Sequence, residues 1–297
     1  MNKFLLPLVL ALLVSACAKP TSTDSDVSHD VRATAKTVKH SLATVLAAQP
    51  EDVRARYVYR NPQDTLEFFG LDPGTTVIEA LPGTGWYTKI LLDYIGADGH
   101  LIGADYAMAM WPLFGFFPDE FIEAKKTWTT DWTAEAEEWR GDDDAPVSAF
   151  VFGSMPAKYE GKADAVLFIR ALHNLNRFES KGGFLSAALS DAHKALKPGG
   201  IVGVVQHRSP DSFPDEWADG SRGYLKKDAL IARIEAAGFE FLGSSEINVN
   251  PKDQPTEEDI VWRLPPTYFT SRENPELHAK MEAIGESNRM TLKFRKP

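Results

Sequence analysis

Cysteine is nearly absent from this sequence of 297 residues, which contains Cys17 and no other. A single cysteine excludes an internal disulfide and any cysteine-rich metal site. The seven histidines include no H-x-x-x-H pair, and the sequence has no G-x-S-x-G segment, the motif that carries a serine nucleophile. The sequence therefore predicts no metal site.

Positive charge is also scarce. The chain has 32 Lys and Arg against 42 Asp and Glu, which gives a formal net charge of −10. No cluster of Lys and Arg stands out that would neutralise a row of phosphates. We therefore expect no nucleic-acid partner.

Long hydrophobic runs are missing beyond the first residues. The opening stretch MNKFLLPLVLALLVSAC has a basic Lys3 and an apolar run from Phe4 to Val14, too short to span a bilayer comfortably. It predicts a secretory signal over residues 1–16. The polar segment 17–30 predicts a flexible tether.

The end of that signal, VSAC at 14–17, resembles the lipobox of bacterial lipoproteins. The resemblance implies that Cys17 is lipidated and becomes the mature N-terminus. Ala18 rather than Asp follows, which implies the periplasmic face of the outer membrane in the bacterial cell envelope, with membrane contact through the lipid anchor. An ordinary signal with a chance cysteine is the alternative.

The rest of the chain alternates strand and helix patterns. Residues 31–48 and the segment QDTLEFFGL predict a helical N-terminal extension over 31–70, and residues 71–297 predict one further domain. Its expected strands are 76–81, 100–106, 147–153, 163–169, 200–207, 239–249 and 290–296, and its expected helices are 84–96, 181–200 and 226–239. The alternation predicts an α/β fold, with a mainly parallel seven-stranded sheet, helices on both faces and an antiparallel edge.

The first crossing, VIEALPGTGWYTKIL at 77–91, is the most informative stretch. Gly83 and Gly85 let the backbone turn sharply and approach a ligand closely. A dinucleotide fold would show G-x-G-x-x-G, and its third glycine would fall at Thr88. This weakens the alternative of an NAD-dependent dehydrogenase. We expect Glu79, an acid inside an apolar run, to lie at the edge of the cleft.

The stretch resembles the first motif of class I S-adenosylmethionine (SAM)-dependent methyltransferases, E/D-x-G-x-G-x-G. Glu79 matches the acid and Gly83 and Gly85 match the last two glycines, whereas Leu81 replaces the first. PGTGWYT (82–88), RALHN (170–174) and TLKFRKP (291–297) resemble a group of predicted methyltransferases, from about Arg56 to Pro297. The resemblance implies a Rossmann-like methyltransferase fold and SAM as cofactor.

The same resemblance implies site residues. Glu79, Gly83 and Gly85 would form the cofactor cradle, in which Glu79 could organise the loop or bind the amine of SAM directly or through water. Asp105, at the end of the second strand, would bond the ribose hydroxyls. Ser154, after the third strand, would lie near the adenine. A plain sharp turn at the glycines, without a ligand, is the alternative.

Further candidates follow the fourth and fifth strands. Arg170 is assigned to the cofactor site, and it could instead pair with an acidic substrate or orient neighbouring backbone. His173 is the first candidate for a base because its ordinary pKa lies near neutrality, and Asn174 could hold a polar group of the substrate. His207 is a second candidate base.

Three other segments are weaker candidates. Tyr57 and Arg60 could roof the cleft, and the apolar insert MAMWPLFGFF at 108–117 could form one wall of a substrate pocket or touch a membrane. Each could equally be ordinary packing.

Two functions remain open at this stage. One is a lipid-anchored methyltransferase that acts on a small molecule. The other is an exported, non-catalytic binding module that reuses the fold, which Leu81 and the export signal favour.

Overall fold

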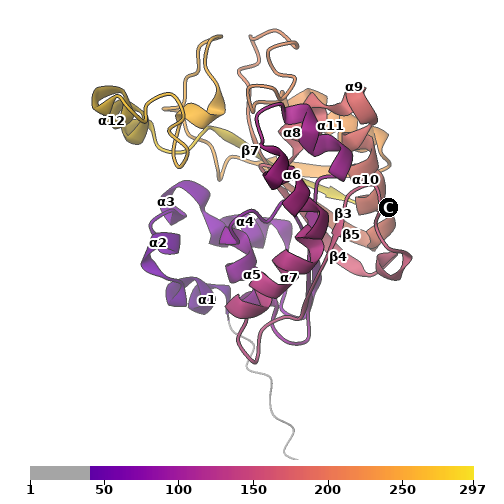
Figure 1. Ribbon diagram of the computed structural model, residues 1–297. Coiled ribbons are helices and arrows are strands. Elements are labelled where there is room, and N and C mark those ends of the chain that lie inside the picture. Colours follow the sequence, from indigo (N-terminus) through magenta and orange to yellow (C-terminus); the bar gives the residue numbers. More distant parts are fainter. Residues whose placement is uncertain (1–40) are drawn as a thin grey trace, which may run out of the picture. The chain divides into compact units, whose positions relative to one another are not determined.

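The computed structural model describes residues 41–297, so the predicted signal, tether and Cys17 lie outside the described residues. Its centre is one seven-stranded sheet in the order β3-β2-β1-β4-β5-β7-β6 (Figure 1). The strands are β1 (Thr76–Ala80), β2 (His100–Asp105), β3 (Val147–Val151), β4 (Ala163–Ile169), β5 (Leu196–His207), β6 (Glu240–Ser245) and β7 (Arg289–Arg295). Strands β1 to β5 pair in parallel, and β7 runs antiparallel between β5 and β6. The predicted mainly parallel sheet with an antiparallel edge is confirmed.

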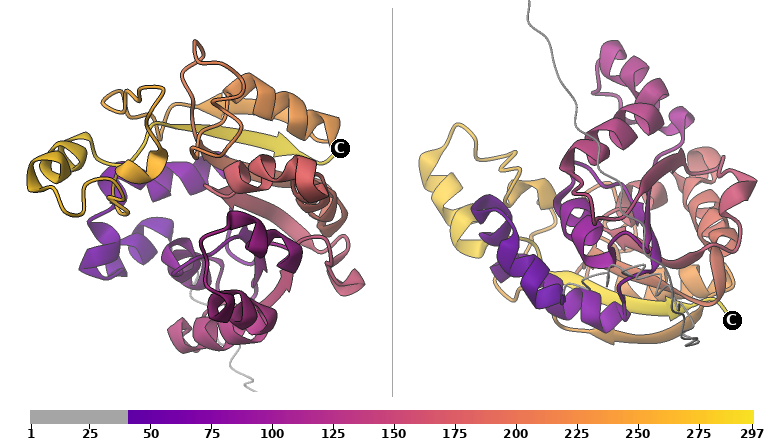
Figure 2. Two further views of the ribbon diagram at one scale, coloured as in Figure 1. Left: turned by 45° about the horizontal axis from the view of Figure 1, so that its top comes forward. Right: turned by 90° about the horizontal axis from the view of Figure 1, so that it is seen from below.

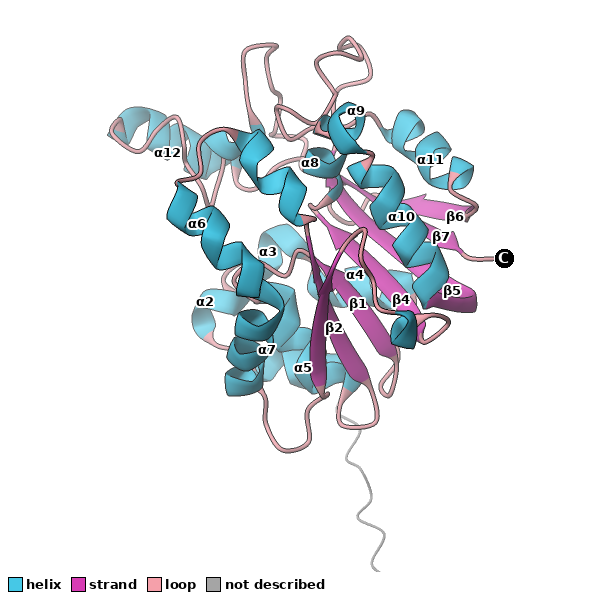
Figure 3. Ribbon diagram, turned by 45° about the vertical axis from the view of Figure 1, so that its right-hand side comes forward, coloured by secondary structure: helices cyan, strands magenta, loops and turns pink. Residues whose placement is uncertain are grey.

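Helices cover both faces of the sheet (Figure 3). They are α1 (Leu42–Ala48), α2 (Glu51–Arg54), α3 (Tyr57–Arg60), α4 (Pro62–Phe69), α5 (Trp86–Ile95), α6 (Asp119–Ala124), α7 (Trp128–Trp139), α8 (Leu172–Arg177), α9 (Glu179–Gly182), α10 (Phe184–Ala195), α11 (Lys227–Ala236) and α12 (Pro275–Ile284). Short 3-10 helices are η1 (Met108–Phe114), η2 (Lys125–Thr127), η3 (Ala157–Tyr159) and η4 (Val261–Arg263).

The inner strands β1, β2, β4 and β5 send side chains to two hydrophobic cores, one on each face of the sheet. In β1, Val77 joins the core beneath α1, α4 and α5, and Ile78 joins the core beneath α8, α10 and α11. Leu167 and Phe168 of β4 divide in the same way. Successive side chains of a strand point to opposite faces, so a sheet covered on both faces needs apolar residues in succession. These runs are why the sequence predicts the inner strands well.

The helical N-terminal extension packs onto the sheet. Leu42, Val45 and Leu46 of α1 and Phe69 of α4 belong to the same core as α5. Helix α4 ends at Gly70, whose φ of +76° suits glycine at a helix terminus. The predicted helix over 31–48 is described only from Leu42.

Two details differ from the predicted elements. The helix expected over 181–200 is broken at Gly183, whose φ is +66°, and α10 ends at Ala195. The Lys-Pro-Gly-Gly segment that follows belongs to β5, because Lys296 pairs with Gly200 and extends the ladder with β7.

Two long inserts contribute walls to the cleft at the carboxyl ends of the central strands, and helix α7 of the first insert also packs along β2 and β3. One runs from β2 to β3 and contains η1, α6 and α7. The other runs from β6 to β7 and contains α12. Figure 2 shows the second insert beside the N-terminal helices, and the Asn61 side chain donates to the Ile247 carbonyl at 2.8 Å across that contact.

Within residues 41–297, no helix combines the length and apolar character needed to cross a membrane.

Candidate functional site

A cleft of about 380 Å³ opens at the carboxyl ends of β1, β2, β4 and β5. Such sheets bind ligands where the strand order reverses, here between β1 and β4. The volume lies in the range of roughly 300–1,000 Å³ that small-molecule sites occupy. Its walls come from the loop after β1, the strand ends, the insert before α7 and the segments 261–267 and 286–287.

The loop after β1 carries three left-handed residues. The φ angles are +55° at Leu81, +59° at Gly83 and +79° at Gly85. Leu81 therefore adopts a left-handed conformation that glycine reaches freely. For leucine this conformation costs about 1–2 kcal/mol. The backbone path of a glycine motif is kept here without its first glycine.

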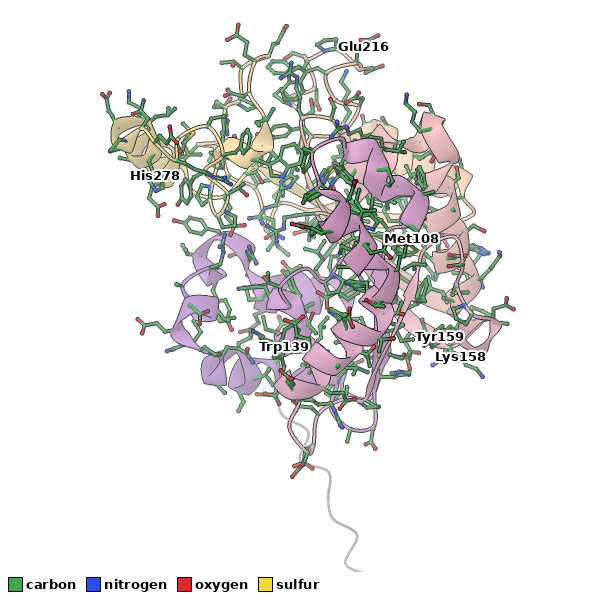
Figure 4. The ribbon with its side chains drawn as sticks, viewed as in Figure 1. Met108, Trp139, Lys158, Tyr159, Glu216 and His278 are labelled. Atoms are coloured by element: carbon green, nitrogen blue, oxygen red, sulfur yellow. The ribbon has the colours of Figure 1, made fainter. Side chains whose placement is uncertain are left out.

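Leu81 and Gly83 line the cleft, and Gly85 lies behind them. A Cβ on Gly85 would approach the Trp139 ring to 2.3 Å, so helix α7 closes over the start of α5. Figure 4 labels Trp139 at the end of α7. Gly85 thus serves helix packing rather than the cleft surface.

Glu79 lies beneath the loop. Its carboxylate is 4% exposed and accepts a hydrogen bond of 2.7 Å from the Thr88 hydroxyl on α5. Burial raises the pKa of Glu79 to about 7, although the Thr88 hydrogen bond opposes that shift. Glu79 is not among the lining residues, so the expectation that it borders the cleft is wrong. Strand β1 is buried on both faces, and Glu79 points to the α5 side.

Asp105 lines the cleft at the end of β2. One carboxylate oxygen accepts from the Tyr106 amide at 2.8 Å, and the other accepts from Lys125 Nζ at 2.9 Å. Burial raises the pKa of Asp105, and Lys125 acts against that rise. The Lys125 ammonium also lies 4.2 Å from the centre of the Trp111 ring, so the insert is fastened to the strand end.

Arg170, His173 and Asn174 line the cleft where β4 leads into α8. The Asn174 amide donates to the Tyr106 hydroxyl at 3.2 Å, which in turn donates to the Ala171 carbonyl. The Asn174 carbonyl oxygen is buried and has no hydrogen-bond partner among residues 41–297. A ligand donor in the cleft would satisfy it.

His173 and His207 form a buried pair whose ring centres lie 5.5 Å apart. His173 Nδ1 lies 3.4 Å from the Gln206 side-chain oxygen, and Gln206 donates its own amide to the Gly223 carbonyl. His173 Nδ1 therefore carries the proton, and Nε2 remains as the proton acceptor. Burial lowers the pKa of His173 to about 4, so the ring is neutral at neutral pH.

His207 Nδ1 lies 2.6 Å from the Ser287 hydroxyl. Burial, with the nearby His173 and Arg170, lowers the pKa of His207 well below its ordinary value. Two neutral imidazoles therefore face the same cleft, and both predicted base candidates are brought together.

Ser154 does not line the cleft. It is exposed, and its hydroxyl donates to the Val151 carbonyl at 3.1 Å. The Gly153 amide next to it donates to Asp191 of α10 at 2.7 Å, which holds this loop against α10. The expectation of Ser154 at the cleft is therefore wrong.

Sequence reasoning missed the far wall of the cleft. Trp262, Leu264, Pro265, Pro266 and Thr267 line it, with Glu286 and Ser287. They belong to the long insert before β7, whose sequence shows no helical or strand periodicity from which its structure could be predicted. The Pro-Pro pair is the one local signal, because it marks a rigid irregular segment.

The comparisons with known proteins agree with this architecture. No protein-family model matches the chain. An arsenite methyltransferase of Halobacterium salinarum is 25% identical over 202 residues, which is 66% of this chain and 44% of that protein. The chain thus matches less than half the length of this curated relative.

Among solved structures, geranyl diphosphate C-methyltransferase from Streptomyces coelicolor A3(2) has a TM-score of 0.50 at 13% identity, and the match covers 88% of this chain and 86% of that one. A SAM dependent methyltransferase from Aquifex aeolicus has a TM-score of 0.47 at 12% identity, covering 87% and 100%. The chain has the class I methyltransferase fold.

The residues present fit the cofactor of that fold. The left-handed loop at 81–85 leaves room over Gly83, where an added Cβ would meet nothing nearer than 3.9 Å. Asp105 lines the cleft with a buried carboxylate, and the hydroxyls of a ribose would share its oxygens with the Tyr106 amide and Lys125. Asn174 lines the same cleft.

Proposed function

We propose that this protein is a SAM-dependent methyltransferase that transfers a methyl group to a small organic acceptor. The observation that carries the proposal is the cleft at the β1–β4 reversal, with the left-handed loop after β1 on one side and Asp105 at the end of β2. The loop would hold the methionine part of the cofactor, and Asp105 would hold the ribose. Bound SAM supplies an activated methyl group.

The chain's own residues supply position and proton transfer. His173 Nε2 would accept a proton from the acceptor, and Asn174, which lines the same cleft, would orient a polar group of the acceptor. Trp111, Trp128 and Trp262 would exclude water from the reacting groups. Both imidazoles are neutral, which supports a role as proton acceptor, because a protonated imidazole has no free ring nitrogen to accept a proton.

The name of the halobacterial relative suggests arsenite as an alternative acceptor. Arsenic(III) is a soft centre that soft thiolate ligands suit. The only cysteine of this chain is Cys17, so the cleft has no thiolate to offer. We therefore do not extend arsenite to this protein.

Titration of S-adenosylhomocysteine, the demethylated cofactor, into the full-length chain in mild detergent tests the proposal. We expect micromolar binding by calorimetry. Asp105→Asn should weaken it about tenfold or more, because charge-assisted hydrogen bonds to the ribose are lost. Glu276→Gln is the matched control and should bind within about twofold of the wild type, since Glu276 forms an exposed pair with Lys280 and is absent from the cleft lining.

No heat with the wild type would refute the methyltransferase and favour the exported binding module. Equal binding by Asp105→Asn would refute the assignment of Asp105.

We also propose that Cys17 anchors the protein by lipid to the periplasmic face of the outer membrane. The lipobox-like VSAC and the lack of any other cysteine support this. Cys17→Ser should move the protein from the membrane fraction to the soluble fraction, and retention at the membrane would overturn the anchor.

A further inference from the structure

Four arginines surround the buried carboxylate of Glu286. Arg56 pairs with it, Arg60 Nε lies 2.9 Å from it, Arg289 Nη1 lies 3.1 Å away and Arg170 Nη1 lies 3.8 Å away. We call these four residues the arginine cluster. Glu286 is 2% exposed, so the group forms largely out of water.

The cluster carries more positive charge than Glu286 can balance. Four guanidiniums face one carboxylate, and burial together with Arg170 lowers the pKa of Arg60 to about 10. The Nε atoms of Arg170 and Arg289 are buried and have no hydrogen-bond partner within the described part of the chain. A surplus of buried positive charge is costly unless a further anion balances it.

Arg170 connects the cluster to the cleft. It lines the cleft with Glu286 and Ser287, and its side chain is 29% exposed. From the end of β4 it reaches Glu286 in the segment before β7, and it lines the same cleft as the loop after β1. Its φ of +59° is unusual for arginine and indicates that the surrounding structure imposes this direction.

The cleft also carries aromatic and apolar side chains. Trp262 and Leu264 line it, Trp111 lines the opposite wall, and the Trp262 ring lies 5.7 Å from the His173 ring. An acid with a flat apolar body would place its charge at Arg170 and its body between the two indoles, close to His173.

We propose that the methyl acceptor is a small organic acid with an apolar or aromatic body, whose carboxylate docks on Arg170 in front of the arginine cluster. The inference rests on the proposed function and names the substrate class of the same cleft. A carboxylate suits the site because the planar guanidinium binds it with two parallel hydrogen bonds.

Benzoate and its neutral isostere benzamide test the charge requirement. Each is titrated by calorimetry into the full chain, with and without saturating S-adenosylhomocysteine. We expect benzoate to bind about tenfold more tightly than benzamide. Arg170→Gln should bring the ratio of the benzoate affinity to the benzamide affinity close to one. Arg170→Lys should keep part of the preference for benzoate.

Arg140→Gln is the matched control. Arg140 pairs with Glu137 at the protein surface and is absent from the cleft lining, so the ratio should stay near ten. Circular dichroism and the melting temperature of each variant establish that it is folded. If Arg170→Gln does not fold, the comparison of Arg170→Lys with the wild type decides.

A wild-type ratio near one would overturn the proposal, and so would a high ratio that persists in Arg170→Gln. A second arm excludes the cofactor's own carboxylate as the anion. Arg170→Gln should bind S-adenosylhomocysteine and methylthioadenosine, which lacks the amino acid, as the wild type does. Selective loss of S-adenosylhomocysteine would assign Arg170 to the cofactor and overturn the acceptor acid.

The two proposals fail separately. If S-adenosylhomocysteine does not bind the wild type, the methyltransferase proposal fails, while the titrations without it still show whether the cleft selects an acid.

Discussion

At the scale of single residues, Glu79 is the clearest case in which a motif position and its surroundings assign different roles. The resemblance places it in the cofactor cradle, whereas the structure buries it against Thr88 on α5. A carboxyl group tied to the first turn of α5 fixes the angle at which the loop leaves β1. Its contribution to the site is therefore through the backbone of the loop.

The raised pKa of Glu79 gives a pH-dependent stability with a definite sign. The folded state holds a proton up to about pH 7, whereas the unfolded chain releases it near 4.5. The free energy of unfolding therefore falls as pH rises from about 4.5 to 7, by roughly 3 kcal/mol for this group. Glu79→Gln, which does not titrate, should lack this fall.

Urea unfolding of both proteins at pH 5 and pH 8 measures the effect. The difference between wild type and Glu79→Gln should change by roughly 3 kcal/mol between the two pH values. The comparison cancels the buried histidines, which titrate alike in both proteins. A difference that is the same at both pH values would show that Glu79 does not take up the proton.

At the scale of elements, helix α7 packs against the loop at 81–85. Its last residue, Trp139, covers Gly85, and Lys89 of α5 lies 4.6 Å above the same ring. The insert between β2 and β3 thus shapes the loop as well as the cleft wall.

Alanine at Gly85 tests this contact. Gly85→Ala should destabilise the fold by about 3 kcal/mol or more, because a left-handed backbone and a clash with Trp139 add together. Gly83→Ala is the control: it has the left-handed backbone without the clash, and we expect about 1–2 kcal/mol.

Chemical unfolding of Gly85→Ala in a Trp139→Ala background completes a double-mutant cycle between these two residues. Removal of the indole should bring the cost of Gly85→Ala down to that of Gly83→Ala. If the cost of Gly85→Ala is unchanged without Trp139, the contact does not explain the glycine.

The elements that the sequence predicts well are those with a regular period. The inner strands show continuous apolar runs, and α5 and α10 end or break at glycines. The sequence does not reveal which way Glu79 points, because a strand buried on both faces has no polar side to set its phase. The left-handed Leu81 is also hidden, since leucine gives no signal for that conformation.

At the scale of the whole molecule, the parts of the site that the sequence does not predict are formed by segments that lie far apart in the chain. Arg56 and Glu286 lie 230 residues apart in sequence, and their contact joins the N-terminal helices to the segment before β7. No local sequence pattern predicts a contact between residues so far apart in the chain. The predicted candidates after β4 and β5 were found because strand ends converge at one edge by topology alone.

Glu286 should therefore stabilise the whole fold. Glu286→Gln leaves the arginine cluster without its carboxylate and should lower the free energy of unfolding by about 3–5 kcal/mol. Glu276→Gln, at an exposed pair with Lys280, should cost less than about 1 kcal/mol.

The pH dependence of Glu286 has the opposite sign to that of Glu79. The surrounding arginines overcome burial and lower the pKa of Glu286 from 4.5 to about 2, so its contribution is complete above about pH 4.5 and is lost as pH falls towards 2. Unfolding at pH 3 and pH 6 should show this loss in the wild type and not in Glu286→Gln. Inorganic phosphate, an anion able to take the place of the missing carboxylate, should raise the melting temperature of Glu286→Gln more than that of the wild type. If Glu286→Gln is as stable as the wild type at pH 6, the cluster does not join the two segments energetically.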